Sequence, residues 1–175
     1  QVRYVEDGLI IMQDGKIQWF GSWDEGQKHL AENIQVAHYP EQLIVPGLID
    51  THIHFPQTEM VGAYGEQLLE WLNTYTFPTE IQFADTAYSE KIAEFFVQEL
   101  LKNGTTTALV FCTVHPESVD ALFTAASRRN MRLIAGKVLM DRHAPEALKD
   151  TAESAYTDSK ALIEKWHGQG RNLYA

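Results

Sequence analysis

The chain has 175 residues, of which 45% are hydrophobic and 22% are charged, proportions that are ordinary for a soluble globular protein with one sizeable core. Its formal net charge of −10, without a cluster of Lys and Arg, argues against nucleic acid as a partner. No apolar run approaches the about 18 residues of a membrane span, so we expect no membrane partner.

The single cysteine, Cys112, excludes an internal disulfide and indicates a reducing compartment, so we expect a cytoplasmic protein. One cysteine also excludes a zinc site of the cytidine-deaminase kind, which needs His-x-Glu and Pro-Cys-x-x-Cys. Any zinc ligands must therefore be His and carboxylate. The chain begins at Gln1 without a visible signal peptide, and we expect the natural N-terminus to lie upstream.

Residues 1–45 are expected to form a small β-layer. Two strand-like runs, residues 9–13 and 16–20, flank the pair Asp14-Gly15. An Asp-Gly pair between two such runs is typical of a hairpin with a type I′ turn.

A strand is expected to resume at residues 43–45, and this apolar run leads to two histidines separated by one residue. Residues i and i+2 of a strand point to the same face, so Asp50, His52 and His54 are expected to face one way. Two imidazoles on one strand face can reach one divalent ion at about 2.0–2.1 Å. Pro56 then ends the strand, which places the pair at its carboxyl end.

From residue 46 onward, strands and helices alternate. We expect helices at residues 66–73, 89–103, 116–129 and 151–167, and strands at residues 105–112, 131–140 and 172–175. Pro78 is expected to limit the first helix, and Ser89 to cap the second. Alternation of this kind predicts a parallel sheet, which is either a small open sheet or the first half of an eight-stranded barrel.

A catalytic zinc needs at least three protein ligands, and the candidates for a third are weak. His115 lies just past the end of a strand. It could lie beside the metal, or it could be a loop residue at the start of the next helix. Asp141 could face the site or serve a turn, and we interpret Lys137 as structural. The other histidines are expected on the surface: His29, His38, His143 and His167.

Residues 46–54, Pro-Gly-Leu-Ile-Asp-Thr-His-Ile-His, resemble the signature that opens the barrel of the amidohydrolase superfamily of metalloenzymes. Residues 55–57 extend this likeness toward the guanine deaminases of that superfamily. Further segments with the same likeness are residues 68–72, 75–80 and 102–107.

The resemblance implies an α/β fold, the first half of a (β/α)8 TIM-like barrel preceded by a small β-sandwich portion. Residues 1–45 would be the N-terminal part of the small β-sandwich domain, and residues 46–175 would be the first βα units of an incomplete barrel. The chain is accordingly expected to be an N-terminal fragment, inactive alone. Its catalytic residues and remaining metal ligands would lie beyond Ala175.

The resemblance also implies the chemistry, which is the zinc-dependent hydrolytic deamination of guanine to xanthine and ammonia. His52 and His54 would bind one zinc per subunit, with iron as the alternative metal. Gln57 would bind the purine, because an amide offers both a donor and an acceptor. His54, Phe55, Pro56 and Trp71 would line the substrate site, although Trp71 could equally belong to the core. The expected assembly is a homodimer.

Two alternatives remain at this point. The protein could be another deaminase or cyclic amidohydrolase of the same superfamily, acting on a related ring. It could instead be a non-catalytic α/β binding module in which the two histidines are merely packed.

Overall fold

The computed structural model describes residues 3–65, 67–170 and 173–175. The chain divides into two compact units, Gln1–Ile44 and Val45–Ala175. The parts of the expected segments that fall on Val2, Glu66 and Asn172 lie outside the described residues.

The first unit is built on an antiparallel hairpin of β1 (Gly8–Gln13) and β2 (Lys16–Ser22). At the turn between them, Asp14 and Gly15 have positive φ angles of 53° and 70°. A type I′ turn requires positive φ at both central positions, so the predicted hairpin is confirmed.

The indole of Trp19 lies at the centre of this unit. Gly21 and Gly26 approach the ring so closely that a Cβ atom at either position would overlap it. The second of these glycines ends α1 (Trp23–Gly26), which is followed by the short 3-10 helix η1 (Gln27–His29). The two glycines thus let the helix fold back onto the hairpin.

Residues 43–47 form no strand, so the strand expected at 43–45 is wrong. A strand needs a neighbour for its backbone groups, and no described residue pairs with this segment. Its three apolar side chains are between 57% and 69% exposed. Gly47 then packs against Thr106 with no room for a Cβ atom, and the next strand begins one residue later.

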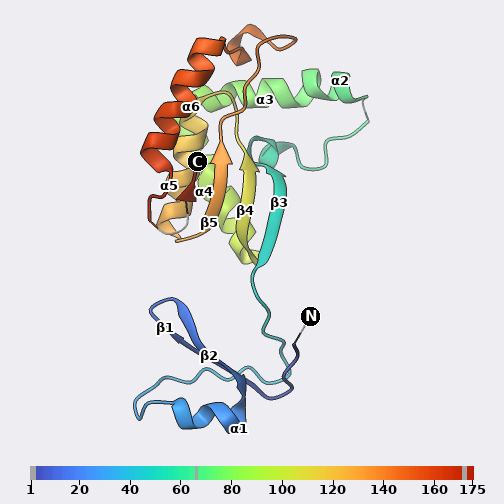
Figure 1. Cartoon of the computed structure of the whole chain (residues 1–175). Coiled ribbons are helices and arrows are strands. Elements are labelled where there is room, and N and C mark those ends of the chain that lie inside the picture. Colours follow the sequence, from blue (N-terminus) through green and yellow to red (C-terminus); the bar gives the residue numbers. More distant parts are fainter. Residues whose placement is uncertain (1–2, 66, 171–172) are drawn as a thin grey trace. The chain divides into compact units, whose positions relative to one another are not determined.

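The second unit contains a four-stranded parallel sheet in the order β3-β4-β5-β6 (Figure 1). The strands are β3 (Leu48–His54), β4 (Thr105–Phe111), β5 (Arg132–Gly136) and β6 (Leu173–Tyr174). This arrangement confirms the predicted α/β fold. The strand expected at 131–140 is shorter than predicted, because its neighbour β4 already ends at Phe111 and the chain beyond it turns into a helix.

Three helices connect the strands: α4 (Thr86–Lys102), α5 (Pro116–Arg128) and α6 (Ala152–Trp166). Asp85 caps α4, since its Oδ1 accepts a hydrogen bond of 2.7 Å from the backbone N–H of Tyr88. The predicted cap, Ser89, is wrong. It lies inside the helix, fully buried, and its hydroxyl donates to the carbonyl of Phe83 at 2.9 Å.

Between β3 and α4 the backbone is helical for most of its length. The short 3-10 helix η2 (Phe55–Met60) follows β3. After a loop come α2 (Leu68–Trp71), the π-helical turn η3 (Leu72–Thr76), α3 (Phe77–Ile81) and the 3-10 turn η4 (Gln82–Ala84). The predicted stop before Pro78 is wrong. Pro78 lies in the first turn of α3, where a missing N–H is tolerated, and the preceding π-turn changes the hydrogen-bonding pattern there.

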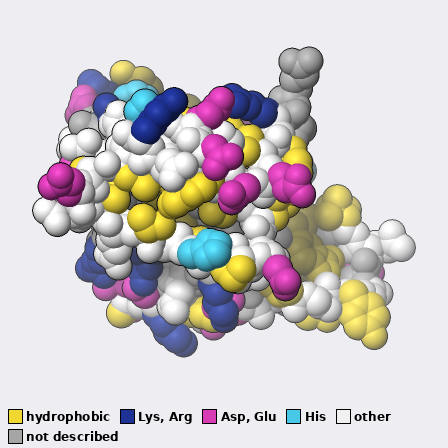
Figure 2. All heavy atoms as spheres, turned by 90° about the horizontal axis from the view of Figure 1, so that it is seen from below, with side chains coloured by type: hydrophobic (Ala, Val, Ile, Leu, Met, Phe, Trp, Pro, Cys, Tyr) yellow, Lys and Arg dark blue, Asp and Glu magenta, His cyan; other side chains and the backbone are white. Residues whose placement is uncertain are grey.

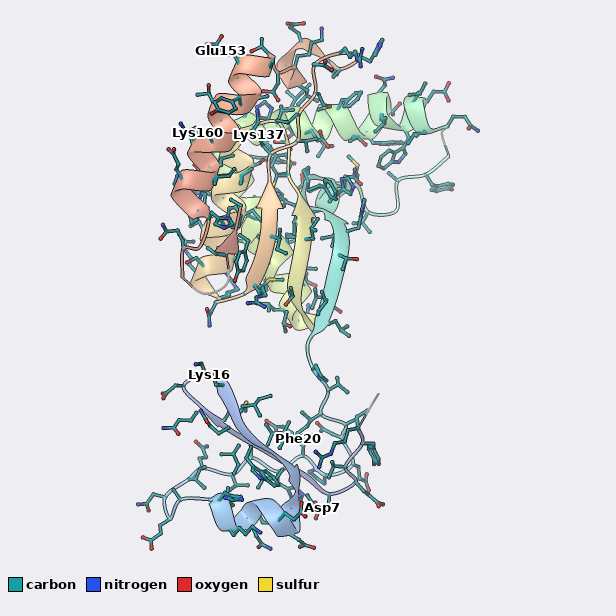
Figure 3. All side chains as sticks on the ribbon, viewed as in Figure 1. Asp7, Lys16, Phe20, Lys137, Glu153 and Lys160 are labelled. Atoms are coloured by element: carbon teal, nitrogen blue, oxygen red, sulfur yellow. The ribbon has the colours of Figure 1, made fainter. Side chains whose placement is uncertain are left out.

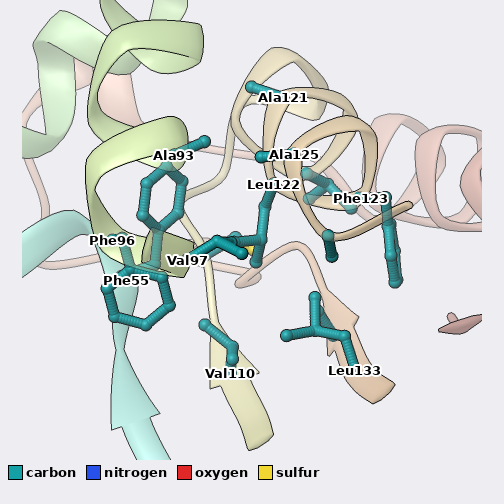
Figure 4. Close-up of a cluster of buried hydrophobic side chains, with 14 of the residues drawn as sticks. Phe55, Ala93, Phe96, Val97, Val110, Ala121, Leu122, Phe123, Ala125 and Leu133 are labelled. Atoms are coloured by element: carbon teal, nitrogen blue, oxygen red, sulfur yellow. The ribbon is translucent and has the colours of Figure 1, made fainter. Parts of the chain in front are cut away.

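The core of the second unit lies between the sheet and its helices (Figure 4). α4, α5 and α6 gather on one side of the sheet (Figure 1). Alternate residues of β4, such as Ala108 and Val110, are buried against them at 0% and 2% exposure. On the other face, Leu109 of β4 and Ile134 of β5 are 37% and 44% exposed. The described sheet is therefore covered by helices on one face only.

The described surface is mixed in character. Figure 2 shows one face, on which hydrophobic side chains lie among acidic and basic ones. Among the described residues, no helix is both long enough and apolar enough to cross a membrane.

The burial of α6 can be tested with two adjacent residues of similar size. Leu162 is 5% exposed and Ile163 is 49% exposed. We expect Leu162→Ala to lower the free energy of unfolding by about 2–5 kcal/mol, because it leaves a cavity in the core. Ile163→Ala, the matched control, should cost roughly half as much or less. Urea unfolding of the full-length protein measures both, and equal losses would contradict the packing of α6.

Candidate metal centre

The carboxyl end of β3 brings two imidazoles together. His52 and His54 project from the same face of the strand, with their Nε2 atoms 3.2 Å apart and their ring centroids 5.2 Å apart. Between them Ile53 turns the other way and packs against the core. The two-residue repeat of the strand is thus the reason why the histidines converge.

The geometry fits a shared divalent ion. Two nitrogen ligands of one tetrahedral ion, each at about 2.0–2.1 Å, lie about 3.3 Å apart. The observed Nε2 separation of 3.2 Å is close to this value. Burial, with a smaller contribution from the charge of His52, lowers the pKa of His54. A lowered pKa favours the neutral imidazole, which is the form that binds metals.

The described residues contain no third partner for this pair. No group of three or more His, Cys, Asp or Glu side chains among them could hold a metal ion. Asp50, two residues before His52, accepts a hydrogen bond from the backbone N–H of His52 at 3.0 Å through Oδ1. Asp141 lies beyond the end of β5, with its side chain 77% exposed and paired with Arg142. The other histidines predicted on the surface are exposed: His29, His38, His143 and His167.

Lys137 follows β5 and is structural, as predicted. Its side chain is 1% exposed, and its ammonium group pairs with Asp150 at 2.7 Å and with Asp158 at 3.4 Å. Figure 3 shows Lys137 beside α6, the helix that carries Asp158. The pair between Lys137 and Asp150 holds together the two ends of the long segment that follows β5.

His115 lies near this ion pair. Burial is the main cause that lowers the pKa of its imidazole, and the nearby charge of Lys137 acts in the same direction. The negative charges of Glu117 and Asp150 act in the opposite direction and raise this pKa. The Nε2 atom of His115 is buried and has no hydrogen-bond partner among the described residues. His115 is thus a partly buried imidazole whose pKa is influenced by the nearby charges of Lys137 and Asp150.

An open hollow of about 750 Å³ adjoins the histidine pair along the free edge of β3 and reaches α4. Its lining includes His52, His54, Gln57 and Trp71. Gln57 lies on η2, directly after the strand. Trp71 donates from its indole N–H to the carbonyl of Ala63 at 3.1 Å, which fixes its ring at the hollow. The structure thus brings together four of the predicted site residues.

The structure places Phe55 and Pro56 elsewhere. Both side chains are fully buried, and the ring of Phe55 packs against Phe83 and Phe96 at centroid distances of 5.0 and 5.5 Å. Figure 4 shows Phe55 inside this hydrophobic cluster. The expectation that Phe55 contacts a ligand is therefore corrected, because a core ring in this position offers no free face. The two residues anchor the start of η2 and so position Gln57.

Two further residues of the second unit, Phe111 and Glu80, were not singled out by sequence reasoning. Phe111 ends β4, opposite His54 in the register of the sheet, and its ring contacts both imidazoles. The pairing of two strands that are distant in sequence creates this contact, so no local pattern indicates it. Glu80 of α3 is only 7% exposed, and burial raises the pKa of its carboxyl to about 7. α3 packs against η2, which carries Gln57.

Residues 43–173 match the sequence profile of the Amidohydrolase family. The guanine deaminase of Escherichia coli K12 is 62% identical to this chain over 174 residues, which are 99% of this chain and 40% of that protein. The chain thus spans about 40% of the length of the curated relatives it matches.

Solved structures of guanine deaminases share the fold. The structure of the Escherichia coli enzyme matches with a TM-score of 0.94 over 98% of this chain and 40% of that one. The enzyme from Bradyrhizobium japonicum matches with a TM-score of 0.92 and 45% identity, over 99% of this chain and 37% of that one. An enzyme from C. acetobutylicum with guanine bound in its active site matches with a TM-score of 0.85 and 31% identity, over 95% of this chain and 39% of that one.

The raised pKa of Glu80 predicts a pH-dependent stability. As the pH rises from its ordinary pKa of 4.5 to about 7, Glu80 ionises in the unfolded chain but stays protonated in the folded one. Stability is therefore lost across this window, and the loss is complete above about pH 7. Glu80→Gln stays neutral at every pH, so its stability relative to the native protein should be higher at pH 8 than at pH 5.

Urea unfolding of the full-length protein at the two pH values measures this difference. Glu90→Gln, at an exposed position of α4, is the control and should show no such dependence. If the free energies of unfolding of Glu80→Gln and the native protein differ by the same amount at pH 5 and at pH 8, the pKa of Glu80 is not raised.

Proposed function

The chain belongs to the amidohydrolase family, and we propose that the whole protein is a metal-dependent enzyme that converts guanine to xanthine and ammonia. The observation that carries this proposal is the identity with guanine deaminase across nearly the whole chain. The convergent histidine pair and the glutamine beside it supply the chemistry that such a reaction needs at this edge of the sheet.

His52 and His54 are the proposed metal ligands. Their Nε2 atoms already have the separation that two ligands of one ion require. When bound, a zinc ion in such a site lowers the pKa of its water toward about 7 and supplies hydroxide at neutral pH. Nitrogen ligands of this type also suit iron, which remains the alternative metal. The two histidines hold the metal at the carboxyl end of β3, where a barrel of this kind places its chemistry.

Gln57 is the proposed contact to the purine. Its amide can donate to one atom of the base edge and accept from another, which a neutral base requires. The buried pair Phe55 and Pro56 holds the start of η2 in place, and Gln57 lines the same hollow as the histidines. Trp71 offers an aromatic surface on the same hollow, suited to a flat ring.

The rest of the site belongs to the part of the relatives' length that this chain does not span. We place the further metal ligands and the proton-transferring glutamate there. Within this proposal, residues 1–45 contribute to a small β-sandwich domain and residues 46–175 form the first units of a (β/α)8 barrel. A cytoplasmic homodimer with one metal ion per subunit completes the proposal, and the lone buried thiol of Cys112 fits a reducing compartment.

Removal of the histidine pair tests the metal site. We expect the full-length protein to contain about one zinc or iron ion per subunit and the double variant His52→Ala/His54→Ala to contain none. Elemental analysis of purified protein measures this. The matched control is His143→Ala/His167→Ala, which removes two exposed histidines and should keep the metal. A native protein that never retains a metal would favour a non-catalytic binding module instead.

Truncation of Gln57 tests the base contact. In the full-length protein, Gln57→Ala should lower kcat/KM for guanine by about 10- to 100-fold, because the base edge loses its hydrogen bonds. The metal content should not change. Gln98→Ala, at an exposed position on α4, is the control. Native kinetics in Gln57→Ala would remove Gln57 from the site, and a preference of the native enzyme for another ring or cyclic amide over guanine would favour a different member of the family.

A further inference from the structure

We propose that Phe111 is a positioning residue for the metal centre, which sets the orientation of both imidazoles and excludes water from one side of them. This inference rests on the proposed metal site, and it adds to that site a side chain from a different strand. It is carried by the contacts that the ring of Phe111 makes with His52 and His54.

The first step is the register of the sheet. β3 and β4 pair in parallel so that His54 lies opposite Phe111. Residues that are opposite in such a ladder share one face, so the benzyl group of Phe111 projects beside the imidazole of His54. The next strand pairs Gly136 with Phe111. That glycine has no side chain, and a Cβ atom there would meet nothing within 4 Å. On this face, therefore, the histidines are the strand neighbours that support the ring.

The second step is the geometry of the three rings. The centroid of Phe111 lies 4.8 Å from that of His52 and 4.9 Å from that of His54. The ring is nearly parallel to His54, with an interplanar angle of 15°, and is tilted by 44° against His52. Aromatic rings at these separations attract one another in offset and tilted arrangements. One phenyl ring therefore restrains both ligands at once.

The third step is the hydrogen bonding of the histidines. A metal-binding histidine usually donates its second ring nitrogen to an acceptor that fixes its orientation. Within the described parts of the chain, the Nδ1 atoms of His52 and His54 have no such partner, and the two rings bond only through Nε2. Packing against Phe111 takes over the orienting role here. The phenyl ring also keeps one side of the pair apolar, which limits the access of solvent to the ligands.

The test is a competition between a chromophoric zinc chelator and the metal-free full-length protein. We expect Phe111→Ala to weaken the zinc Kd by about tenfold or more, as outer contacts of metal ligands do. Phe111→Tyr keeps the ring and should stay within about threefold of the native Kd. Leu109→Ala is the matched control, because Leu109 lies on the same strand and points to the same face two residues earlier. It should bind zinc like the native protein.

Substitution by Co²⁺ gives a second readout, because its visible spectrum reports ligand geometry. We expect an altered spectrum in Phe111→Ala and a native one in Phe111→Tyr and Leu109→Ala. If Phe111→Ala does not fold, Phe111→Leu, which keeps most of the volume but not the ring, should show a smaller loss in the same direction. A native zinc Kd and Co²⁺ spectrum in folded Phe111→Ala, or in Phe111→Leu where Phe111→Ala does not fold, would overturn the inference. Native protein that binds no zinc would instead refute the metal site itself.

Discussion

The parallel pairing of β3 with β4 is the constraint on which the rest of the site depends. Because β3 is held as a strand, successive side chains point to opposite faces of the sheet. Ile53 therefore packs against the core, while His52 and His54 project from the other face. The same pairing brings Phe111 against the two imidazoles. A shift of one residue would turn both histidines toward the helices and Ile53 outward. The hydrophobic contact of Ile53 thus specifies the position of two polar ligands.

Residues of the histidine site and of the buried ion pair lie where the parallel strands end. His54 ends β3, Phe111 ends β4 and Lys137 directly follows β5. The buried ion pair between Lys137 and Asp150 joins the two ends of the long segment that follows β5. Breaking such a pair by removing one partner is costly, since the other charge stays buried. The face of the sheet that carries Leu109 and Ile134, which are 37% and 44% exposed, is left for further contacts.

Much of this could be predicted from local pattern. The helix predicted at residues 89–103 corresponds to α4, because an apolar stripe at helical spacing is a local pattern. The Asp-Gly turn and the histidine repeat were also predicted, because each depends on backbone geometry within a few residues. The errors have tertiary causes. Residues 43–45 have strand composition but no strand partner, and Pro78 continues a helical stretch through a π-turn that no simple pattern indicates. Phe55 was expected to line the substrate site, yet its ring packs in the core.

The sequence by itself determined the order of strands and helices, the common direction of His52 and His54, and the resemblance to a metal-dependent family. These properties follow from periodicity and from short motifs, which are local. Only the tertiary structure decided that Gln57 and Trp71 share a hollow with the histidines, that Lys137 is neutralised by Asp150 and that Phe111 lies across both imidazoles. Each of these contacts joins residues from different elements, and their meeting depends on strand register and helix packing rather than on the spacing of residues along the chain.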